Sequence, residues 1–166
     1  GIIDVISKDK GGTQFRLYFP ISVEKKEKIQ KSSTHMVAGS GTLLIVDDEE
    51  MIQQTLKGML ESLNYKVFFA KNGKSAIKKY RAHQSDIDAI LMDIQMPIMD
   101  GVEAAEKILK IDPAARIVFT SGYAEAQSFK KLHKMGYQLF IKKPYKITNL
   151  ADIIQRALAT KSITKN

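Results

Sequence analysis

Hydrophobic and polar positions follow two different periods along this chain from Gly41 onward. Short apolar runs rich in Val, Ile, Leu and Phe occur at residues 42–47, 65–70, 88–93, 116–121 and 138–143. After the first run, apolar residues instead recur every three or four positions, at Ile52, Leu56, Leu60 and Leu63. The short runs are typical of buried strands, and the wider spacing is typical of an amphipathic helix.

The later stripes complete an alternation of strands and helices that repeats along the chain. Their apolar positions are Ala76, Ile77 and Tyr80, then Val102, Ala105, Ile108 and Leu109, then Phe129, Leu132 and Met135, and finally Ile147, Leu150, Ile153, Ile154 and Leu158. Such alternation favours right-handed crossovers, which build a parallel sheet with helices on both faces. We therefore predict an α/β fold, a doubly wound five-stranded parallel sheet, over residues 41–160.

Residues 1–40 lack this alternation and predict a separate appendage. Residues 2–7 and 13–19 flank a glycine-containing turn and predict a β-hairpin whose one face carries Phe15, Leu17 and Phe19. After Pro20 the chain becomes charged and then rich in Gly and Ser, which is typical of a linker. The predicted organisation is a hairpin at 1–22, a linker at 23–40, a main domain at 41–160 and a tail at 161–166.

Polar side chains stand at the carboxyl ends of four of the predicted strands. Asp47 and Asp48 end or follow the first strand, Asp93 ends the third, Ser121 the fourth and Lys143 the fifth. Because a parallel sheet gathers these strand ends along one edge, we expect the five side chains to meet there. Carboxylates, a hydroxyl and an ammonium group together suit a hard cation and a phosphoryl group.

The net charge of the chain is also compatible with a second class of function, association with nucleic acid. The chain carries 26 Lys and Arg against 18 Asp and Glu, a net charge of +8. A basic α/β protein that associates with nucleic acid, with its carboxylates serving only structure, would have such a balance. However, most of the basic pairs fall where helix patterns present a solvated face, and no recognition helix or aromatic-basic motif accompanies them.

Composition also limits the cellular setting. The chain has no cysteine, which excludes disulfides and thiolate metal sites and fits a reducing cytoplasm. No apolar stretch approaches the roughly 20 residues needed to span a bilayer, and the first residues lack a signal-peptide pattern. We therefore expect a cytoplasmic domain without a membrane segment, whose parent chain can still be membrane-anchored.

The runs at residues 44–50 and 91–101, together with Lys143-Pro144, resemble the receiver domain of two-component response regulators. The resemblance covers about residues 41–160 and implies a flavodoxin-like sheet with strand order 2-1-3-4-5. It also implies a phosphorelay, in which a histidine kinase or a histidine phosphotransfer domain passes a phosphoryl group to this domain with Mg²⁺ as cofactor. A receiver changes conformation when it is phosphorylated.

The resemblance assigns roles to the acidic residues. Asp93 is expected to be the nucleophile that attacks phosphorus and forms an acyl phosphate. Asp48, Asp93 and the backbone carbonyl of Gln95 are expected to hold Mg²⁺, and Asp47 to act mostly through water, because Mg²⁺ keeps part of its hydration shell. Taken alone, an aspartate that follows a strand is also a common helix N-cap, and this alternative applies to Asp47 and Asp48.

The remaining site residues also take their roles from the resemblance. Lys143 is expected to neutralise phosphoryl oxygens, and Pro144 to form a cis peptide that aims the lysine. Ser121 stands where the family usually has threonine, and it is expected to donate a hydrogen bond to the phosphoryl group. Ser121 and Phe140 would form the conformational switch; for Phe140 the alternative is a plain core residue.

Residues 11–20 resemble the closing strand of a histidine-kinase ATPase domain, which normally ends in proline. Hybrid histidine kinases have this order of segments: an ATPase domain, a linker and a receiver. The alternative is a stand-alone receiver with an unrelated appendage. The ATP-binding boxes and the phosphoaccepting histidine helix are absent from this sequence. Enzymatic activity is therefore expected only as self-phosphorylation and autodephosphorylation. Because only six residues follow position 160, we expect no DNA-binding output domain. The hairpin's exposed edges and apolar stripe favour docking on the receiver or on a second copy of the chain, which would form a homodimer.

Overall fold

The computed structural model describes residues 1–8, 11–20, 39–122 and 132–159. The chain forms two compact units, Gly1–Thr34 and His35–Asn166. Most of the predicted linker and the whole predicted tail lie outside the described residues.

The described part of the first unit contains a two-stranded antiparallel sheet. Strand β1 (Ile2–Lys8) pairs with β2 (Gly12–Tyr18), so that Ile2 lies opposite Tyr18 and Lys8 opposite Gly12. This confirms the predicted hairpin. Its apolar side chains are exposed: Ile2, Ile3, Val5, Phe15, Leu17 and Phe19. A two-stranded sheet with exposed apolar side chains is marginal on its own in water, because it buries too little surface.

The second unit is built on a parallel sheet of five strands. These are β3 (Thr42–Val46), β4 (Lys66–Ala70), β5 (Ala89–Asp93), β6 (Ile117–Ser121) and β7 (Phe140–Lys142). Their order across the sheet is β4-β3-β5-β6-β7, which is the predicted order 2-1-3-4-5 when strands are counted from β3. The predicted strand bounds agree with the structure within two residues.

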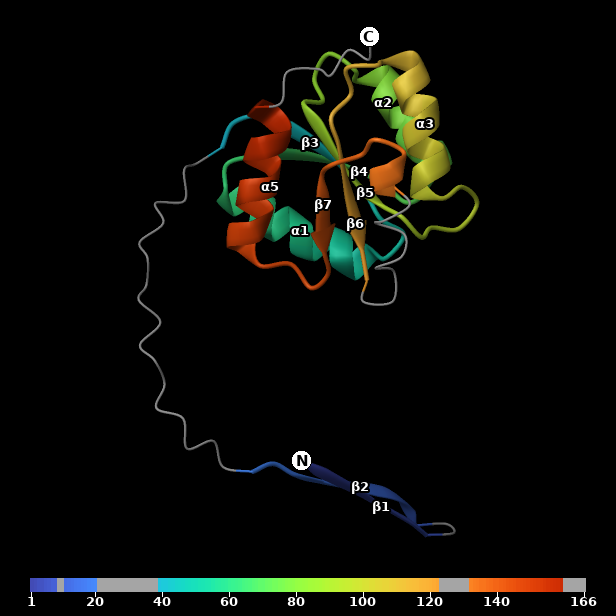
Figure 1. The fold of residues 1–166 in the computed structure, drawn as a ribbon, viewed down its shortest axis with the longest axis vertical. Coiled ribbons are helices and arrows are strands. Elements are labelled where there is room, and N and C mark those ends of the chain that lie inside the picture. Colours follow the sequence, from blue (N-terminus) through green and yellow to red (C-terminus); the bar gives the residue numbers. More distant parts are fainter. Residues whose placement is uncertain (9–10, 21–38, 123–131, 160–166) are drawn as a thin grey trace. The chain divides into compact units, whose positions relative to one another are not determined.

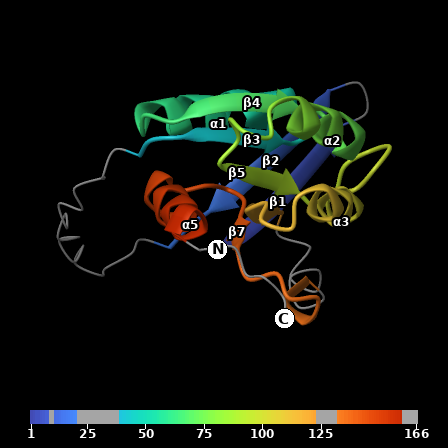
Figure 2. The same ribbon diagram turned by 90° about the horizontal axis from the view of Figure 1, so that it is seen from above.

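Helices cover both faces of this sheet (Figures 1 and 2). Helices α1 (Glu50–Ser62) and α5 (Ile147–Ala159) pack on one face, and α2 (Gly73–Ala82) and α3 (Gly101–Ile111) pack on the other. We call the two hydrophobic layers the α1–α5 core and the α2–α3 core. Leu132, in the short described helical stretch at 132–134, belongs to the α2–α3 core, whereas the predicted partner Phe129 lies outside the described residues.

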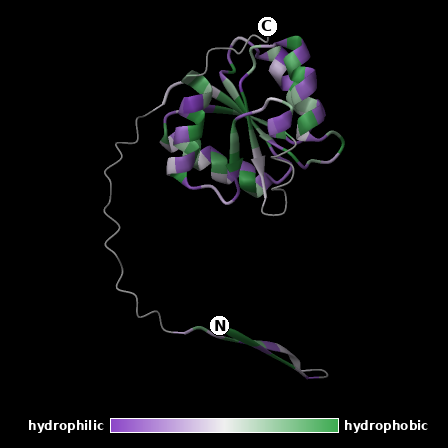
Figure 3. Cartoon of the chain, in the orientation of Figure 1, coloured by the Kyte–Doolittle hydropathy of each residue, from purple (hydrophilic) through white to green (hydrophobic). Residues whose placement is uncertain are grey.

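The central strands are apolar along most of their length, and Figure 3 shows hydrophobic colouring through the middle of the sheet. Every residue of β5 is buried, and so are four of the five residues of β3. Strands covered by helices on both faces need continuous apolar runs, which explains why the sequence showed runs here and not alternation. Within the described ranges, no helix is long and apolar enough to cross a membrane.

Side-chain caps fix where two of the helices begin. Asn72 precedes α2 and accepts a hydrogen bond from the backbone N–H of Ser75, whose side chain in turn accepts one from the N–H of Asn72. Asp100 precedes α3 and accepts from the N–H of Glu103 over 2.8 Å. These caps satisfy N–H groups that the first helical turn leaves unpaired. The Asp100 cap therefore sets the end of the loop that leaves β5.

Gly101, the first residue of α3, packs directly against the end of β5. A Cβ at this position would collide with the carbonyl oxygen of Asp93 and lie 2.9 Å from the Met92 side chain. We expect Gly101→Ala to lower the free energy of unfolding by about 2 kcal/mol, because backbone cannot yield as a side chain does. Urea denaturation measures the change.

The matched control is Gly58→Ala. Gly58 lies within α1, and a Cβ there has open space. This substitution should raise the free energy of unfolding by roughly 0.5–1 kcal/mol, because alanine loses less backbone entropy in a helix. Equal stability of the two variants would contradict the close approach of α3 to β5.

Candidate functional site

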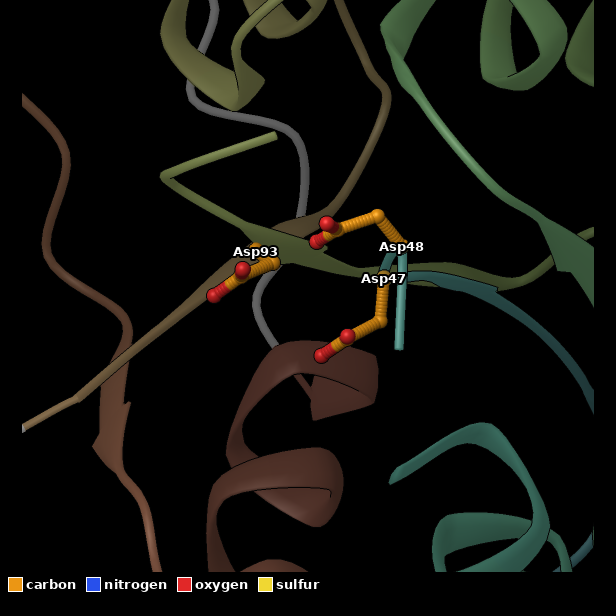
Figure 4. Close-up of side chains that lie close together, drawn as sticks. All are labelled: Asp47, Asp48 and Asp93. Carbon is orange, nitrogen blue, oxygen red and sulfur yellow. The ribbon is translucent and has the colours of Figure 1, made fainter. Parts of the chain in front are cut away.

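Three carboxylates meet at the carboxyl edge of the sheet (Figure 4). Asp47, Asp48 and Asp93 each have an oxygen within 4.8 Å of an oxygen of the other two. Asp47 and Asp93 are almost completely buried, whereas Asp48 is exposed. The structure thus brings together three of the five side chains that the sequence places at this edge.

Strand register explains this proximity. Val46 of β3 pairs directly with Met92 of β5, so the residues that come next in the chain, Asp47 and Asp93, lie at the same level of the sheet. The chain then turns away into α1 on one side and into the loop before α3 on the other. The carboxylates are thus held by backbone that the sheet makes rigid.

Lys143, in the loop after β7, supplies the positive charge. Its Nζ lies 2.7 Å from Asp47 Oδ2 and 3.1 Å from Asp93 Oδ1. The peptide bond between Lys143 and Pro144 is cis, as the resemblance implies. Lysine therefore bridges the two buried carboxylates.

The electrostatic setting keeps this lysine charged. Burial by itself would lower the pKa of Lys143, but the hydrogen bond to Asp47 and the charge of Asp93 hold that pKa above its ordinary value. The side chain of Lys143 is only 16% exposed and that of Asp47 1%. The electrostatic attraction within this buried ion pair is stronger than in a surface ion pair, because water screens the charges less.

The backbone of Asp47 is held by a buried amide that the sequence did not reveal. Gln53, one turn into α1, donates from Nε2 to the Asp47 carbonyl oxygen over 2.6 Å and to that of Ala70 over 3.2 Å. Glu49 is the N-cap residue of α1, and its side chain makes no capping hydrogen bond. Among the residues that the structure describes, Asp47 Oδ1 accepts from the N–H of Glu49, two residues on. Neither Asp47 nor Asp48 is therefore the N-cap of α1.

Two hydroxyl side chains at the end of β6 have different contacts. Thr120 Oγ1 donates to Asp93 Oδ1 over 3.3 Å. The fully buried Ser121 donates to the Gly122 carbonyl oxygen over 3.4 Å. Thr120 pairs directly with Asp93 across the sheet, and paired residues of parallel strands point to the same face. Sequence reasoning selected Ser121 and missed Thr120, which only the register of β5 with β6 identifies.

Phe140 lies on the face of the sheet that Ser121 shares. Its half-buried ring stacks on Phe119 with centroids 6.3 Å apart, and both rings belong to the α2–α3 core. Phe119 and Phe140 are paired in the sheet, and Ser121 follows Phe119 by two residues. Ser121 and Phe140 therefore lie on the same face of the sheet.

A pocket opens beside the exposed carboxylate. It is lined by Asp48 together with Ile94, Gln95, Met96, Pro97, Asp100, Val102 and Leu132. Gln95, two residues after Asp93, lines this pocket together with Asp48. Clustered carboxylate oxygens beside a pocket provide the hard, oxygen-only ligands that Mg²⁺ prefers, so the residues present fit this ion.

Comparison with known proteins agrees with this geometry. Residues 43–155 match the family model described as the response regulator receiver domain. Sensor kinase CckA from Brucella abortus is 28% identical over 95% of this chain, and the chain spans 18% of the length of that kinase. Chemotaxis protein CheY from Thermotoga maritima is 34% identical over 69% of this chain and 94% of its own length.

A solved receiver shows the same fold. The receiver domain of the sensor histidine kinase PA1611 from Pseudomonas aeruginosa has a magnesium ion coordinated in its active site cleft. It matches 74% of this chain and 100% of its own length, with a TM-score of 0.65 and 27% identity. The family match covers more than half of the chain and overlaps every strand of the parallel sheet. The chain therefore belongs to the response regulator receiver domain family.

Proposed function

We infer that this domain accepts a phosphoryl group on Asp93 from a phosphohistidine and changes conformation in response. The observation that carries the proposal is the setting of Asp93, a buried carboxylate that contacts Lys143 and lies beside two further carboxylates. A lone buried carboxylate would be an ion-pair partner only. A lysine shared with an acidic cluster beside a pocket instead suits a transferred phosphoryl group, whose charge needs both the ammonium and a metal ion.

The proposed transfer uses the side chains in distinct roles. A carboxylate oxygen of Asp93 attacks phosphorus as the P–N bond to histidine breaks, and the electron pair of that bond stays on the imidazole. Lys143 contacts Asp93 and neutralises charge on the transferred oxygens. Asp48, Asp93 and the backbone carbonyl of Gln95 would hold Mg²⁺, and Asp47 would act on it through water; the ion would supply the remaining charge neutralisation.

The proposed switch lies on the other face of the sheet. A new phosphoryl group offers acceptor oxygens that Ser121 can reach only by leaving its bond to the Gly122 carbonyl. The space left behind Ser121 lies along the face that Phe140 shares, and the Phe140 ring would move by packing alone because it has no hydroxyl.

The partner is a histidine kinase or a histidine phosphotransfer domain, and the setting is the cytoplasm. Exposed apolar side chains at the carboxyl edge, Met51 and Ile98, favour a protein partner at this edge. The test is incubation with a protein that carries labelled phosphohistidine: label should move to this chain only with Mg²⁺. Failure of transfer, combined with salt-sensitive nucleic-acid binding, would favour the basic nucleic-acid protein instead.

Removing Asp48 should cost the metal site most of its affinity. We expect Asp48→Ala to bind Mg²⁺ more than tenfold more weakly, because one of two proposed carboxylate ligands is lost. The apo protein should be as stable as wild type or more stable, since one of three crowded negative charges is gone. Mg²⁺ titration followed by NMR gives the affinity, and urea denaturation gives the stability.

The matched control for this measurement is Glu50→Ala. Glu50 is an exposed acidic residue in the first turn of α1, close in sequence to Asp48. The Glu50→Ala substitution removes one negative charge, as Asp48→Ala does, but it removes no proposed ligand. The Mg²⁺ affinity should therefore change less than twofold. Equal losses in both variants would mean that Asp48 acts only through long-range charge.

We further infer that the domain derives from a hybrid histidine kinase. The similarity to CckA spans 95% of this chain, so it extends beyond the receiver into the region of the hairpin. The hairpin's exposed Phe15, Leu17 and Phe19 fit a strand pair that normally packs on a larger sheet. In that origin, residues 1–22 are a remnant of the ATPase domain and residues 23–40 are a linker.

Deleting residues 1–40 should leave phosphorylation intact and reduce self-association. The Asp93 site lies entirely in the second unit, whereas the hairpin exposes strand edges and apolar side chains that favour pairing between chains. Light scattering of the full and shortened chains measures association, and Phe19→Asp in the full chain is the control that keeps the hairpin. Loss of phosphorylation in the shortened chain would make the segment part of the receiver.

A further inference from the structure

Tyr145, two residues after Lys143, carries a polar group whose partner is missing. Its ring packs on the α1–α5 core. Its hydroxyl oxygen is fully buried and has no hydrogen-bond partner among the described residues. Leaving a buried hydroxyl unpaired is costly, so such a group calls for an explanation beyond packing.

The position of this hydroxyl points to the phosphoacceptor. Thr120, whose hydroxyl already bonds Asp93 Oδ1 over 3.3 Å, is close enough to the Tyr145 hydroxyl to lower the pKa of that tyrosine, although the two form no hydrogen bond of good geometry. Lys143, Asp47 and Asp93 also act on Tyr145 electrostatically. The unpartnered hydroxyl is thus at the dry inner side of the same site.

This hydroxyl keeps its proton at neutral pH. Burial is the largest influence and raises the pKa of Tyr145 to about 12, with the hydroxyl of Thr120 and the charge of Lys143 acting in the opposite direction. A protonated phenol is a hydrogen-bond donor. In the unphosphorylated protein, Asp93 Oδ1 is already bonded to Thr120 and Lys143 and leaves Tyr145 unused.

We propose that Tyr145 is a positioning residue for the phosphorylated state, which donates its hydroxyl hydrogen to an oxygen that the transferred phosphoryl group brings beside Asp93. The inference rests on the proposed function. Phosphorylation adds acceptor oxygens to a site where Tyr145 is the buried donor without a partner among the described residues. Tyr145 would therefore stabilise the phosphorylated form selectively, and it would set how long the phosphoryl group persists.

The test compares wild type with Tyr145→Phe, using beryllofluoride with Mg²⁺ as the phosphoryl probe. A hydrogen bond to a charged acceptor should be lost, so we expect beryllofluoride to bind roughly tenfold more weakly. Mg²⁺ alone should bind within twofold of wild type, and the apo midpoint of thermal unfolding should stay equal or rise, because the variant removes an unsatisfied buried hydroxyl. NMR titration gives both affinities.

Tyr65→Phe is the matched control. Tyr65 is a buried tyrosine of the same α1–α5 core, just before β4 and therefore at the opposite edge of the sheet. Its variant should bind beryllofluoride as wild type does. The role of Tyr145 would be overturned if Tyr145→Phe bound beryllofluoride as tightly as wild type. It would also be overturned if the variant lost affinity for Mg²⁺ as much as for beryllofluoride and unfolded at a lower temperature. Failure of the wild type to bind beryllofluoride at all would instead overturn the proposed function.

Discussion

Replacing Asp93 by asparagine should abolish phosphorylation of this protein. With acetyl phosphate and Mg²⁺, the wild type should gain the mass of one phosphoryl group, and Asp93→Asn should gain none. The amide lacks the negative oxygen that attacks phosphorus, although it keeps the shape of the side chain. Intact-protein mass spectrometry measures the result directly.

The same substitution should also stabilise the apo fold or leave it unchanged. Asp93 lies within a cluster of three carboxylates, and Lys143 can still pair with Asp47 when Asp93 is neutral. The matched control is Asp86→Asn, which removes an exposed carboxylate before β5 and should be phosphorylated as wild type is. A labile phosphate on Asp93→Asn would show that another residue is the acceptor.

Replacing Lys143 by methionine should change stability and metal binding in opposite directions. Lys143 contacts the buried Asp47 at 2.7 Å and Asp93 at 3.1 Å, so its loss leaves two carboxylates without their cation. We expect the free energy of unfolding without Mg²⁺ to fall by about 2 kcal/mol, less than for a fully buried pair because the lysine retains some exposure. Mg²⁺ should then bind several-fold more tightly and restore part of the stability, since it replaces the lost positive charge.

The pH dependence of this stability difference has a definite sign. The folded protein holds the pKa of Lys143 above its ordinary value of 10.5. The stabilisation by Lys143 is therefore fully present at neutral pH, and it decreases only as the pH rises above 10.5 and through the raised pKa. Urea denaturation at neutral and alkaline pH measures this change.

Lys142→Met is the matched control for charge. Lys142 is the exposed last residue of β7, adjacent to Lys143 in sequence. Its replacement should alter the free energy of unfolding by less than about 0.5 kcal/mol. If both variants lose the same stability, or if Lys143→Met binds Mg²⁺ no better than wild type, the coupling of lysine and metal through shared carboxylates is wrong.

The amino-acid sequence determined the architecture and the location of the site. Apolar runs at 42–47 and 88–93 could be identified as buried strands because a strand covered on both faces must be apolar at every position. The polar residues that follow them had to meet, since parallel strands end along one edge. Asp47, Asp48, Asp93 and Lys143 could therefore be placed together from their positions in the chain.

Only the tertiary structure decided which side chains touch within the site. Thr120, Gln53 and Tyr145 carry no signal in the chain that separates them from ordinary strand, helix and loop residues. Thr120 faces Asp93 through the register of β5 with β6, and Gln53 reaches Asp47 and Ala70 because α1 packs over two strands. The Tyr145 hydroxyl is buried by residues distant in sequence. Contacts of this kind depend on strand register and helix packing, which arise from the whole core and not from any local pattern.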